Sequence, residues 1–393
     1  MATTWNPSEL TPTVAASQRE RAIPWYLWCV ALAVTSVTIG GHWDVSWHRS
    51  IGRDTFWTPA HMAIYACGVL AAISCGYLVF NTTFRKPAAM VASSVSVFGF
   101  RAPLGAFIAS WGGIAMLTSA PFDNWWHNAY GLDVKIVSPP HTLLMLGVFA
   151  VKIGTLILVL GAMNRTTDPT AARHLQWLLL YVGGLMLVFL MFFCMEYTWD
   201  VYLHAALPYR VMAIGTPMLL AVLWQASRNR WACTWVALVY MLFVECAVLI
   251  LPLFPAEPKL GPVFETVTHF VPPKFPLLLI VPAILLDVIW NATRKWKPWQ
   301  IALVSGPAFV LPLVAVEWPF ASFLMTKAAA NRFFGTTYVG YGESPNSFDV
   351  LRSFAFPEQG LTLWSGVAWA ILFAILSTWL GVKLGRWMRA IQR

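Results

Sequence analysis

The chain has 393 residues, of which 58% are hydrophobic and only 11% are charged, and its mean hydropathy is +0.64. About a quarter of the residues of a soluble globular protein are charged, so this composition excludes that class. The net charge is +9, but the basic residues stand in short clusters between long apolar runs. We therefore expect a membrane protein that binds no nucleic acid.

Ten apolar runs follow one another along the chain, and each is long enough to cross ~30 Å of hydrocarbon as a helix. They lie near residues 23–42, 58–80, 100–120, 140–162, 175–198, 209–226, 231–253, 273–291, 300–318 and 361–383. The polar residues 1–22 precede the first run and are predicted to form a cytoplasmic tail. The predicted fold class is an all-α polytopic integral membrane protein with about ten transmembrane helices.

The connections between these runs carry an asymmetric charge. One set, together with both tails, holds sixteen Lys and Arg residues against three acids. By the positive-inside rule this face is cytoplasmic, so both termini are predicted on the inner side of a bacterial-type inner membrane. Most acids and nearly all histidines lie on the opposite, periplasmic face. The six cysteines lie within apolar runs and form no Cys-x-x-Cys pair, which predicts neither a disulfide nor a structural zinc site.

A polar motif opens the first outer connection. Asp44 and His48 are four residues apart, Gly52 and Asp54 follow, and His61 stands in the first turn of the next predicted helix. Residues i and i+4 share one face of a helix, with Cβ atoms ~5 to 6 Å apart. The motif can therefore direct a carboxylate and two imidazoles toward one ion.

The same motif recurs about 80 residues later, as an internal repeat of a helix pair. Its members are Asp123, His127, Gly131, Asp133 and His141. Two imidazoles and one carboxylate, with positions left open, suit copper, iron or zinc. We predict two metal sites near the outer face. The predicted ligands of the first site are Asp44, His48 and His61, and those of the second are Asp123, His127 and His141.

Two weaker echoes of the motif follow. Glu196, Asp200 and His204 are spaced four residues apart, which predicts one helix face and makes them secondary metal-ligand candidates. Glu265 and His269 lie in a proline-rich outer segment. A basic residue stands where the last His of the motif would be, so a polar face that packs against a partner is the alternative interpretation.

Two ionisable residues fall inside predicted spans. Lys152 is 11 residues beyond His141, ~16 Å of helix rise, and is predicted to form a buried pair with a carboxylate in mid-bilayer. Asp287 is predicted to pair with a basic group. Such residues are costly in a membrane and indicate function unless a structural partner is found.

The first motif, read from Trp47 to His61, closely resembles a motif in the C subunit of the copper membrane monooxygenases. That family comprises particulate methane monooxygenase and ammonia monooxygenase. The second motif resembles the second copper site of the same subunit, where the family has Asn at the position of Asp123. The resemblance implies that one or two copper ions are bound and that Asp44, His48 and His61 are catalytic as copper ligands. Zinc and iron also accept Asp and His ligands.

From about residue 196 onward, the order of features is similar to that of the A subunit of this family. The matching features are Tyr197–Asp200, Gly215–Pro217, Val281–Asp287, Glu317–Pro319 and Gly385–Trp387. We therefore interpret residues 23–165 as a C-subunit-like domain. Residues 166–393 are interpreted as an A-subunit-like domain with a long outer loop at 319–360, so that two subunits are fused in one chain.

The resemblance implies a transmembrane subunit of a copper-dependent monooxygenase, active only within a complex. Such an enzyme activates O2 near the periplasmic face and hydroxylates a small substrate, such as methane, ammonia or a short hydrocarbon. Family members assemble as a trimer of protomers and include a B subunit with cupredoxin domains. A cupredoxin-bearing partner is therefore expected, and the long aromatic loop is predicted to dock it.

Two other functions stay open. A membrane protein that transports or delivers copper would use the same ligands as stepping stones and would place further ligands in the inner halves of the helices. A haem-handling membrane protein would use histidines beside Trp-rich outer loops. It would be recognised by a haem absorbance band in the pure protein.

Overall fold

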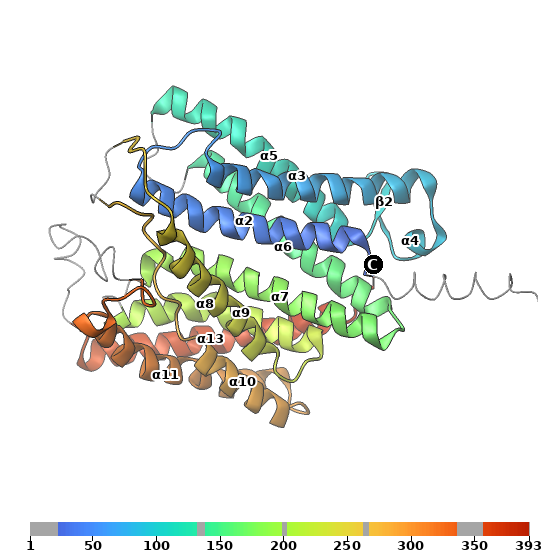
Figure 1. The fold of residues 1–393 in the computed structure, drawn as a ribbon. Coiled ribbons are helices and arrows are strands. Elements are labelled where there is room, and N and C mark those ends of the chain that lie inside the picture. Colours follow the sequence, from blue (N-terminus) through green and yellow to red (C-terminus); the bar gives the residue numbers. More distant parts are fainter. Residues whose placement is uncertain (1–22, 132–137, 199–202, 262–266, 336–356, 393) are drawn as a thin grey trace, which may run out of the picture.

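The computed structural model describes residues 23–131, 138–198, 203–261, 267–335 and 357–392. Almost all of the regular structure in this part of the chain is α-helical, and the protein is an all-α, polytopic membrane protein (Figure 1). The helices are α2 (Trp25–Ser50), α3 (Pro59–Phe80), α4 (Ala88–Ala92), α5 (Leu104–Tyr130), α6 (Pro139–Arg165), α7 (Pro169–Cys194), α8 (Ala206–Ser227), α9 (Ala232–Ile250), α10 (Ile280–Ala292), α11 (Pro298–Leu324) and α13 (Gly360–Met388). A small hairpin of β1 (Val95–Val97) and β2 (Phe100–Ala102) lies between α4 and α5.

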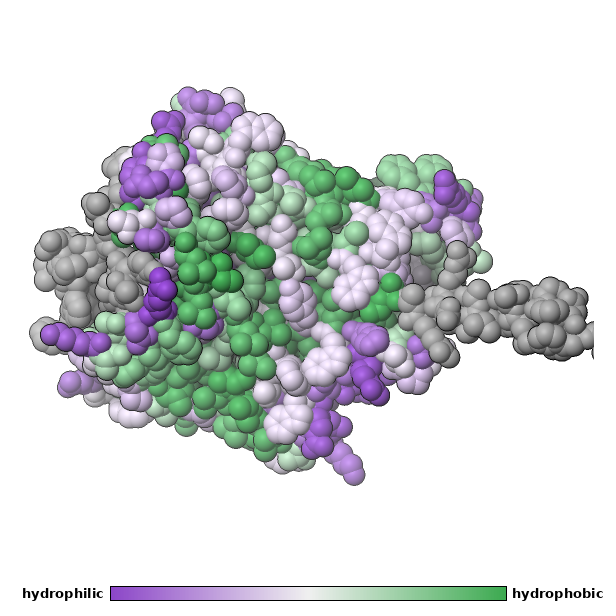
Figure 2. Space-filling model, viewed as in Figure 1, coloured by the Kyte–Doolittle hydropathy of each residue, from purple (hydrophilic) through white to green (hydrophobic). Residues whose placement is uncertain are grey.

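Eight of the described helices are long and apolar enough to cross a membrane. Two of the ten predicted spans differ from that group. The helix α2 is 26 residues long but is less apolar, and α10 has only 13 residues because residues 273–279 ahead of it are not helical. In Figure 2, apolar side chains cover the middle of the molecule, while hydrophilic side chains gather toward the ends of the helices.

Several helices extend beyond their predicted spans on the outer side. The helix α2 continues to Ser50 and α5 to Tyr130, so that both carry the first residues of the polar motifs in their last turns. The helix α11 continues to Leu324, so the long outer loop starts later than residue 319. Most of that loop, residues 336–356, lies outside the described residues.

Close packing of α5 against α6 positions the second motif. A Cβ atom added at Gly112 would lie 2.7 Å from the carbonyl oxygen of Gly147, and one added at Gly147 would lie 2.9 Å from that of Gly112. Small residues at such contacts let two membrane helices approach closely. The outer ends of these helices are thereby held side by side.

The two ionisable residues inside the spans have structural partners, and both predictions about them are wrong. Lys152 is fully buried, and its Nζ donates to Thr38 Oγ1 at 2.8 Å and to the Leu185 carbonyl at 3.1 Å. In the described part of the chain no carboxylate pairs with it. Asp287 pairs with no basic group there either, because its carboxylate accepts hydrogen bonds from the backbone N–H groups of Cys233 and Thr234 at the start of α9.

Candidate metal centres

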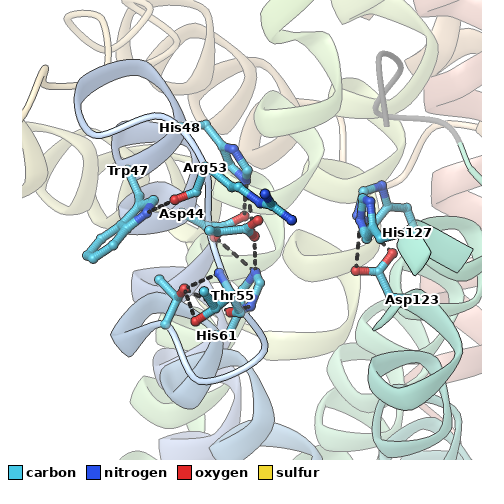
Figure 3. Close-up of polar contacts among 11 residues, drawn as sticks. Asp44, Trp47, His48, Arg53, Thr55, His61, Asp123 and His127 are labelled. Carbon is cyan, nitrogen blue, oxygen red and sulfur yellow. Dashed lines mark hydrogen bonds and ion pairs between the residues drawn. The ribbon is translucent and has the colours of Figure 1, made fainter. Parts of the chain in front are cut away.

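The first motif folds into a cluster of four side chains where α2 ends and α3 begins, here called the outer end after its predicted orientation. Asp44 and His48 come from the last turns of α2, Asp54 from the loop, and His61 from the first turn of α3. His61 Nε2 lies 3.3 Å from Asp44 Oδ1 and 2.9 Å from Asp54 Oδ2. His48 Nε2 lies 3.4 Å from Asp54 Oδ2 and 3.9 Å from Asp44 Oδ2. Figure 3 shows Asp44, His48 and His61 converging.

His48 stands at the rim of this cluster. Donor atoms of Asp44, Asp54 and His61 all lie within 4.8 Å of one another, and His48 is not in this set. The side chain of His48 is 50% exposed, whereas that of His61 is 16% exposed. The structure therefore brings together the three predicted residues, but it adds Asp54 to the centre and leaves His48 toward solvent.

The ring of His61 is fixed by the loop that precedes α3. Its Nδ1 lies 2.9 Å from the carbonyl oxygen of Thr55, and Thr55 and Thr58 hold each other through two hydrogen bonds of 2.8 Å. A histidine that ligates a metal commonly donates its other N–H to a carbonyl in this way. Without a metal, Nε2 donates to the facing carboxylates of Asp44 and Asp54, and a metal ion bound at this nitrogen would replace that proton.

Asp54 belongs to the first cluster but is not among the ligands that the sequence motif predicts. The signal for it was present, since the repeat places Asp133 at the matching position of the second copy. Burial alone would raise the pKa of the Asp54 carboxyl, but hydrogen bonds from His48 and His61 and the charges of those rings outweigh it. Its pKa therefore lies below the ordinary value, and the group is an ionised carboxylate at neutral pH.

The second motif forms a similar cluster at the outer end of α5 and α6. Asp123 and His127 lie in the last turns of α5, and His141 lies in the first turn of α6. His127 Nε2 is 3.3 Å from Asp123 Oδ2, and His141 Nε2 is 3.5 Å from Asp123 Oδ1. Ser138 caps α6 by accepting a hydrogen bond from the His141 backbone N–H at 3.3 Å. The connection at 132–137, which includes Asp133, lies outside the described residues.

The spacing of the donor atoms fits a common ion in both clusters. Two ligand atoms about 2.1 Å from one metal at a tetrahedral angle stand about 3.4 Å apart. The separations that involve Asp44, Asp54 and Asp123 range from 2.9 to 3.9 Å. In addition, Nδ1 of His127 is buried and has no hydrogen-bond partner among the described residues. Both clusters therefore have the chemistry and the spacing of a transition-metal site.

Tyr65 packs beside the first cluster. It lies one turn beyond His61 on α3, with the two ring centroids 5.9 Å apart. In the view of Figure 3, Asp123 and His127 of the second cluster lie next to the first cluster.

The last turns of α2, which carry Asp44 and His48, are braced by the segment that follows α9. Ser46 Oγ donates to the Val271 carbonyl at 2.6 Å, and the Val271 N–H donates to Ser50 Oγ at 2.7 Å. Lys259 Nζ donates to the Ser50 carbonyl at 2.5 Å. A small apolar cluster underlies these bonds, formed by Ile51, Ala256, Val267, Phe270 and Val271. The first centre is therefore positioned by residues about 200 positions away in sequence.

The weaker candidates do not form a third cluster in the described part of the chain. His204 is buried, and its Nε2 lies 3.0 Å from the Trp318 carbonyl and 2.8 Å from Ser322 Oγ. Asp200 and the side chain of Glu196 lie outside the described residues. His269 Nδ1 contacts Thr268 Oγ1 at 2.9 Å. The contacts of His204 join the segment ahead of α8 to α11, whereas His269 contacts its neighbour in sequence.

Comparisons of the chain with models of protein families, with curated proteins and with solved structures found no match. A functional inference therefore depends on the chemistry of the two clusters and on the motifs that build them.

Proposed function

We propose that this protein is the transmembrane subunit of a copper-dependent membrane monooxygenase that hydroxylates a small substrate. The observation that carries the proposal is a pair of Asp/His clusters, built by two copies of one motif and placed together at the outer ends of α2, α3, α5 and α6. The resemblance of both motifs to the C subunit of particulate methane and ammonia monooxygenases supports the same function.

The residues of the first cluster that would hold copper are Asp44, His48, Asp54 and His61. The second ion would be held by Asp123, His127 and His141. Copper, when bound, supplies the activation of O2 for hydroxylation. Imidazole nitrogen is a good ligand for copper, and the two carboxylates of the first cluster would offset the positive charge of the ion.

The chain itself orients the ligands. The Thr55 carbonyl fixes the ring of His61, and Asp54 contacts the imidazoles of both His48 and His61. The aromatic ring of Phe56 packs on that of Tyr65 beside the first cluster, with centroids 5.2 Å apart. Aromatic side chains beside a polar site suit a small apolar or weakly polar substrate.

Electrons and assembly require a partner. A subunit with cupredoxin domains, on the periplasmic side of a bacterial-type inner membrane, would supply the electron-transfer function in a trimer of protomers. The cytoplasmic position of both termini and the outer position of the clusters follow from the distribution of basic residues.

Copper transport is a weaker candidate because the inner halves of the helices do not continue the ligand path. Lys152 is hydrogen-bonded to Thr38 and Leu185, and Asp287 caps α9. Both groups make structural contacts, so neither is available to bind an ion that leaves the outer clusters.

Metal analysis and electron paramagnetic resonance of the native complex test the proposal. We expect bound copper, its loss from the first cluster in His61→Ala and from the second in His127→Ala, and loss of substrate oxidation in at least one of them. His269→Ala is the control, because that histidine lies at the outer face but in neither cluster. A native complex without transition metal would overturn the proposal, and a haem absorbance band would favour the haem-handling alternative.

A further inference from the structure

A basic pocket lies at the end of the bundle that is remote from the metal clusters. The C-terminal ends of α8 and α13 and the loop after α10 enclose a cavity of about 300 Å³, lined by Arg228, Arg294, Arg386 and Arg389. The C-terminal segment places this pocket at the inner end of α6, since Asn164 Nδ2 donates to the Ile391 carbonyl at 2.8 Å. The metal ligand of α6, His141, lies at the opposite end of that helix.

The charge of the pocket is not neutralised by the protein. No acidic residue lines it, and no carboxylate forms an ion pair with any of its four guanidinium groups in the part of the chain that the structure describes. Arg228 and Arg294 each donate to an asparagine side chain, Asn164 and Asn291. A guanidinium carries five N–H donors, so most of the donor capacity of this pocket remains for an anion.

A buried donor in the pocket wall also lacks an acceptor. Trp224 lines the cavity and is 7% exposed, and its indole Nε1 is buried without a hydrogen-bond partner among the described residues. Arg294 lies over this indole ring, 5.9 Å from its centroid. The side-chain oxygen of Asn229 accepts the Trp231 N–H at 2.8 Å, which leaves its amide N–H groups to donate. An N–H group in a buried site normally has an acceptor.

An apolar stripe leads along α13 to the same pocket. Leu376, Leu380 and Leu384 are exposed and are spaced one helical turn apart, and the exposed ring of Trp387 follows them beside Arg386. Tryptophan at this level is typical of the boundary between hydrocarbon and headgroups. A ligand with an anionic head and long apolar chains would fit this arrangement, whereas free phosphate would contact only the basic part.

We propose that this pocket binds the phosphate group of an anionic phospholipid, with its acyl chains lying along α13. Guanidinium groups bind phosphate oxygens bidentately, and basic pockets between membrane helices on the cytoplasmic side commonly hold lipid headgroups. The bound lipid joins the ends of α8, α10 and α13, and it is independent of the chemistry of the metal clusters.

The test uses the full-length protein purified in detergent and titrated separately with short-chain phosphatidylglycerol, short-chain phosphatidylcholine and inorganic phosphate. Native mass spectrometry counts the bound molecules. We expect saturable binding of phosphatidylglycerol, at least tenfold weaker binding of the other two, and a loss of roughly tenfold or more in the double variant Arg386→Gln/Arg389→Gln. The double variant Arg386→Lys/Arg389→Lys should retain part of the affinity, because it keeps charge but not the planar fork.

The matched control is Arg230→Gln/Lys295→Gln, which removes two basic residues from the same end of the molecule but outside the pocket. Its phosphatidylglycerol affinity should equal that of the unchanged protein. An equal loss in the control variant would show unspecific attraction and overturn the proposal. Binding of inorganic phosphate as tight as that of phosphatidylglycerol would also overturn it, because the ligand would then be a soluble phosphate. The thermal unfolding midpoint in lipid-free detergent verifies that every variant is folded.

Discussion

Asp54 gives the first cluster a second carboxylate, and this changes the kind of site that the helices alone would form. It lies in the loop between α2 and α3 and contacts both imidazoles, at 3.4 Å from His48 and 2.9 Å from His61. The described part of the second cluster has one carboxylate, Asp123. The first centre should therefore hold a divalent ion more tightly, since it offers one more negative charge in a partly buried position.

The substitution Asp54→Asn tests this difference between the clusters. It keeps the size of the side chain but removes its charge, and we expect the metal affinity of the first centre to fall by roughly 10- to 100-fold. The second centre should be unchanged. Competitive titration with a copper chelator measures both affinities.

Asp168→Asn is the matched control for Asp54→Asn. Asp168 caps α7 through hydrogen bonds from the N–H groups of Thr170 and Ala171, and asparagine is an equally good N-cap residue. This variant should change neither stability nor metal content. Equal copper affinities in Asp54→Asn and the unchanged protein would show that Asp54 is only a structural partner of the histidines.

With free copper buffered near its dissociation constant, bound metal should be lost as the pH falls, because protons and metal compete for the imidazole lone pairs. The loss should begin above pH ~6.5, since the hydrogen bond to Asp54 raises the pKa of His48 above its ordinary value. Asp54 should add no second step near pH 4. Its pKa is below the ordinary value, so its contribution to stability is present above about pH 4 and is lost only as the pH falls further. Metal content after dialysis at a series of pH values measures the loss. Loss that starts only near pH 4 would contradict an imidazole-based site.

Lys152 shows why a buried charge is hard to interpret from sequence. The sequence correctly places it inside a long apolar helix, where it is fully buried, but the groups that receive its hydrogen bonds are a threonine hydroxyl of α2 and a backbone carbonyl of α7. Neither acceptor is charged, so neither can be recognised in the sequence as the partner of a lysine. Three helices meet at this amine, and only their packing in space identifies its partners.

Replacement of Lys152 by methionine should leave the thermal unfolding midpoint unchanged or raise it. The Thr38 hydroxyl still donates to the Val34 carbonyl at 2.6 Å, so the substitution leaves no buried donor unpaired, and it removes a buried polar group at nearly constant volume. Lys152→Ala is the comparison, since it leaves a cavity and should cost roughly 2 to 5 kcal/mol. A lower midpoint in Lys152→Met would contradict the prediction and show that the hydrogen bonds of the amine stabilise the fold. Loss of bound copper at an unchanged midpoint would indicate a functional amine.

At the scale of elements, the loop at residues 51–58 determines whether the first centre forms. Gly52 has a φ of +96°, and a Cβ atom there would lie 3.0 Å from the carbonyl oxygen of Gly261. The Leu260 N–H donates to the Ile51 carbonyl at 3.0 Å. The two loops therefore touch through their backbones, and Asp54 and Thr55 follow directly.

Gly52→Ala should disrupt the first centre and spare the second. The new methyl group combines a strained φ with a clash against backbone, which cannot rotate away. We expect loss of one of the two metal ions. Gly99→Ala is the matched control, because Gly99 has a φ of +84° with nothing within 4 Å of its added Cβ. It should carry the backbone strain, roughly 1 kcal/mol, and keep both ions. Retention of both ions in Gly52→Ala would contradict a dependence on the loop contact.

The helices could be predicted from sequence because each is a local apolar run, and proline at the start of α3, α6, α7 and α11 marks where these helices begin. The residues within each triad could be predicted because a repeat places them near two helix ends. Asp54 could have been included by the same reasoning. The hydrogen bonds of Lys259 and Val271 to the end of α2 could not be predicted, because they join segments that are about 200 residues apart in sequence and share no motif.

At the scale of the whole molecule, the two predicted halves make unequal contributions to the two centres. The described ligands of the second cluster all come from α5 and α6, within residues 23–165. The first cluster has its ligands in the same half, but the segment that braces it belongs to residues 166–393. Residues 166–393 therefore support the first cluster structurally, although none of the described ligand candidates of that cluster belongs to them.

Separation of the chain in the connection at 166–168 tests this dependence. When residues 1–165 and 166–393 are produced together as two chains, we expect them to associate and to bind both ions, because α6 and α7 remain packed together and Arg165 still donates to the Gln392 carbonyl at 2.6 Å.

When residues 1–165 are produced alone, the second centre should bind its ion, and the first should bind at least tenfold more weakly. The last turns of α2 have then lost the hydrogen bonds of Ser46 and Ser50 to the second half, and each such bond contributes roughly 1 kcal/mol. Metal content and copper titration of the purified membrane fractions measure both outcomes. Equal occupancy of the two centres in the isolated half would show that α2 and α3 alone position Asp44, Asp54 and His61.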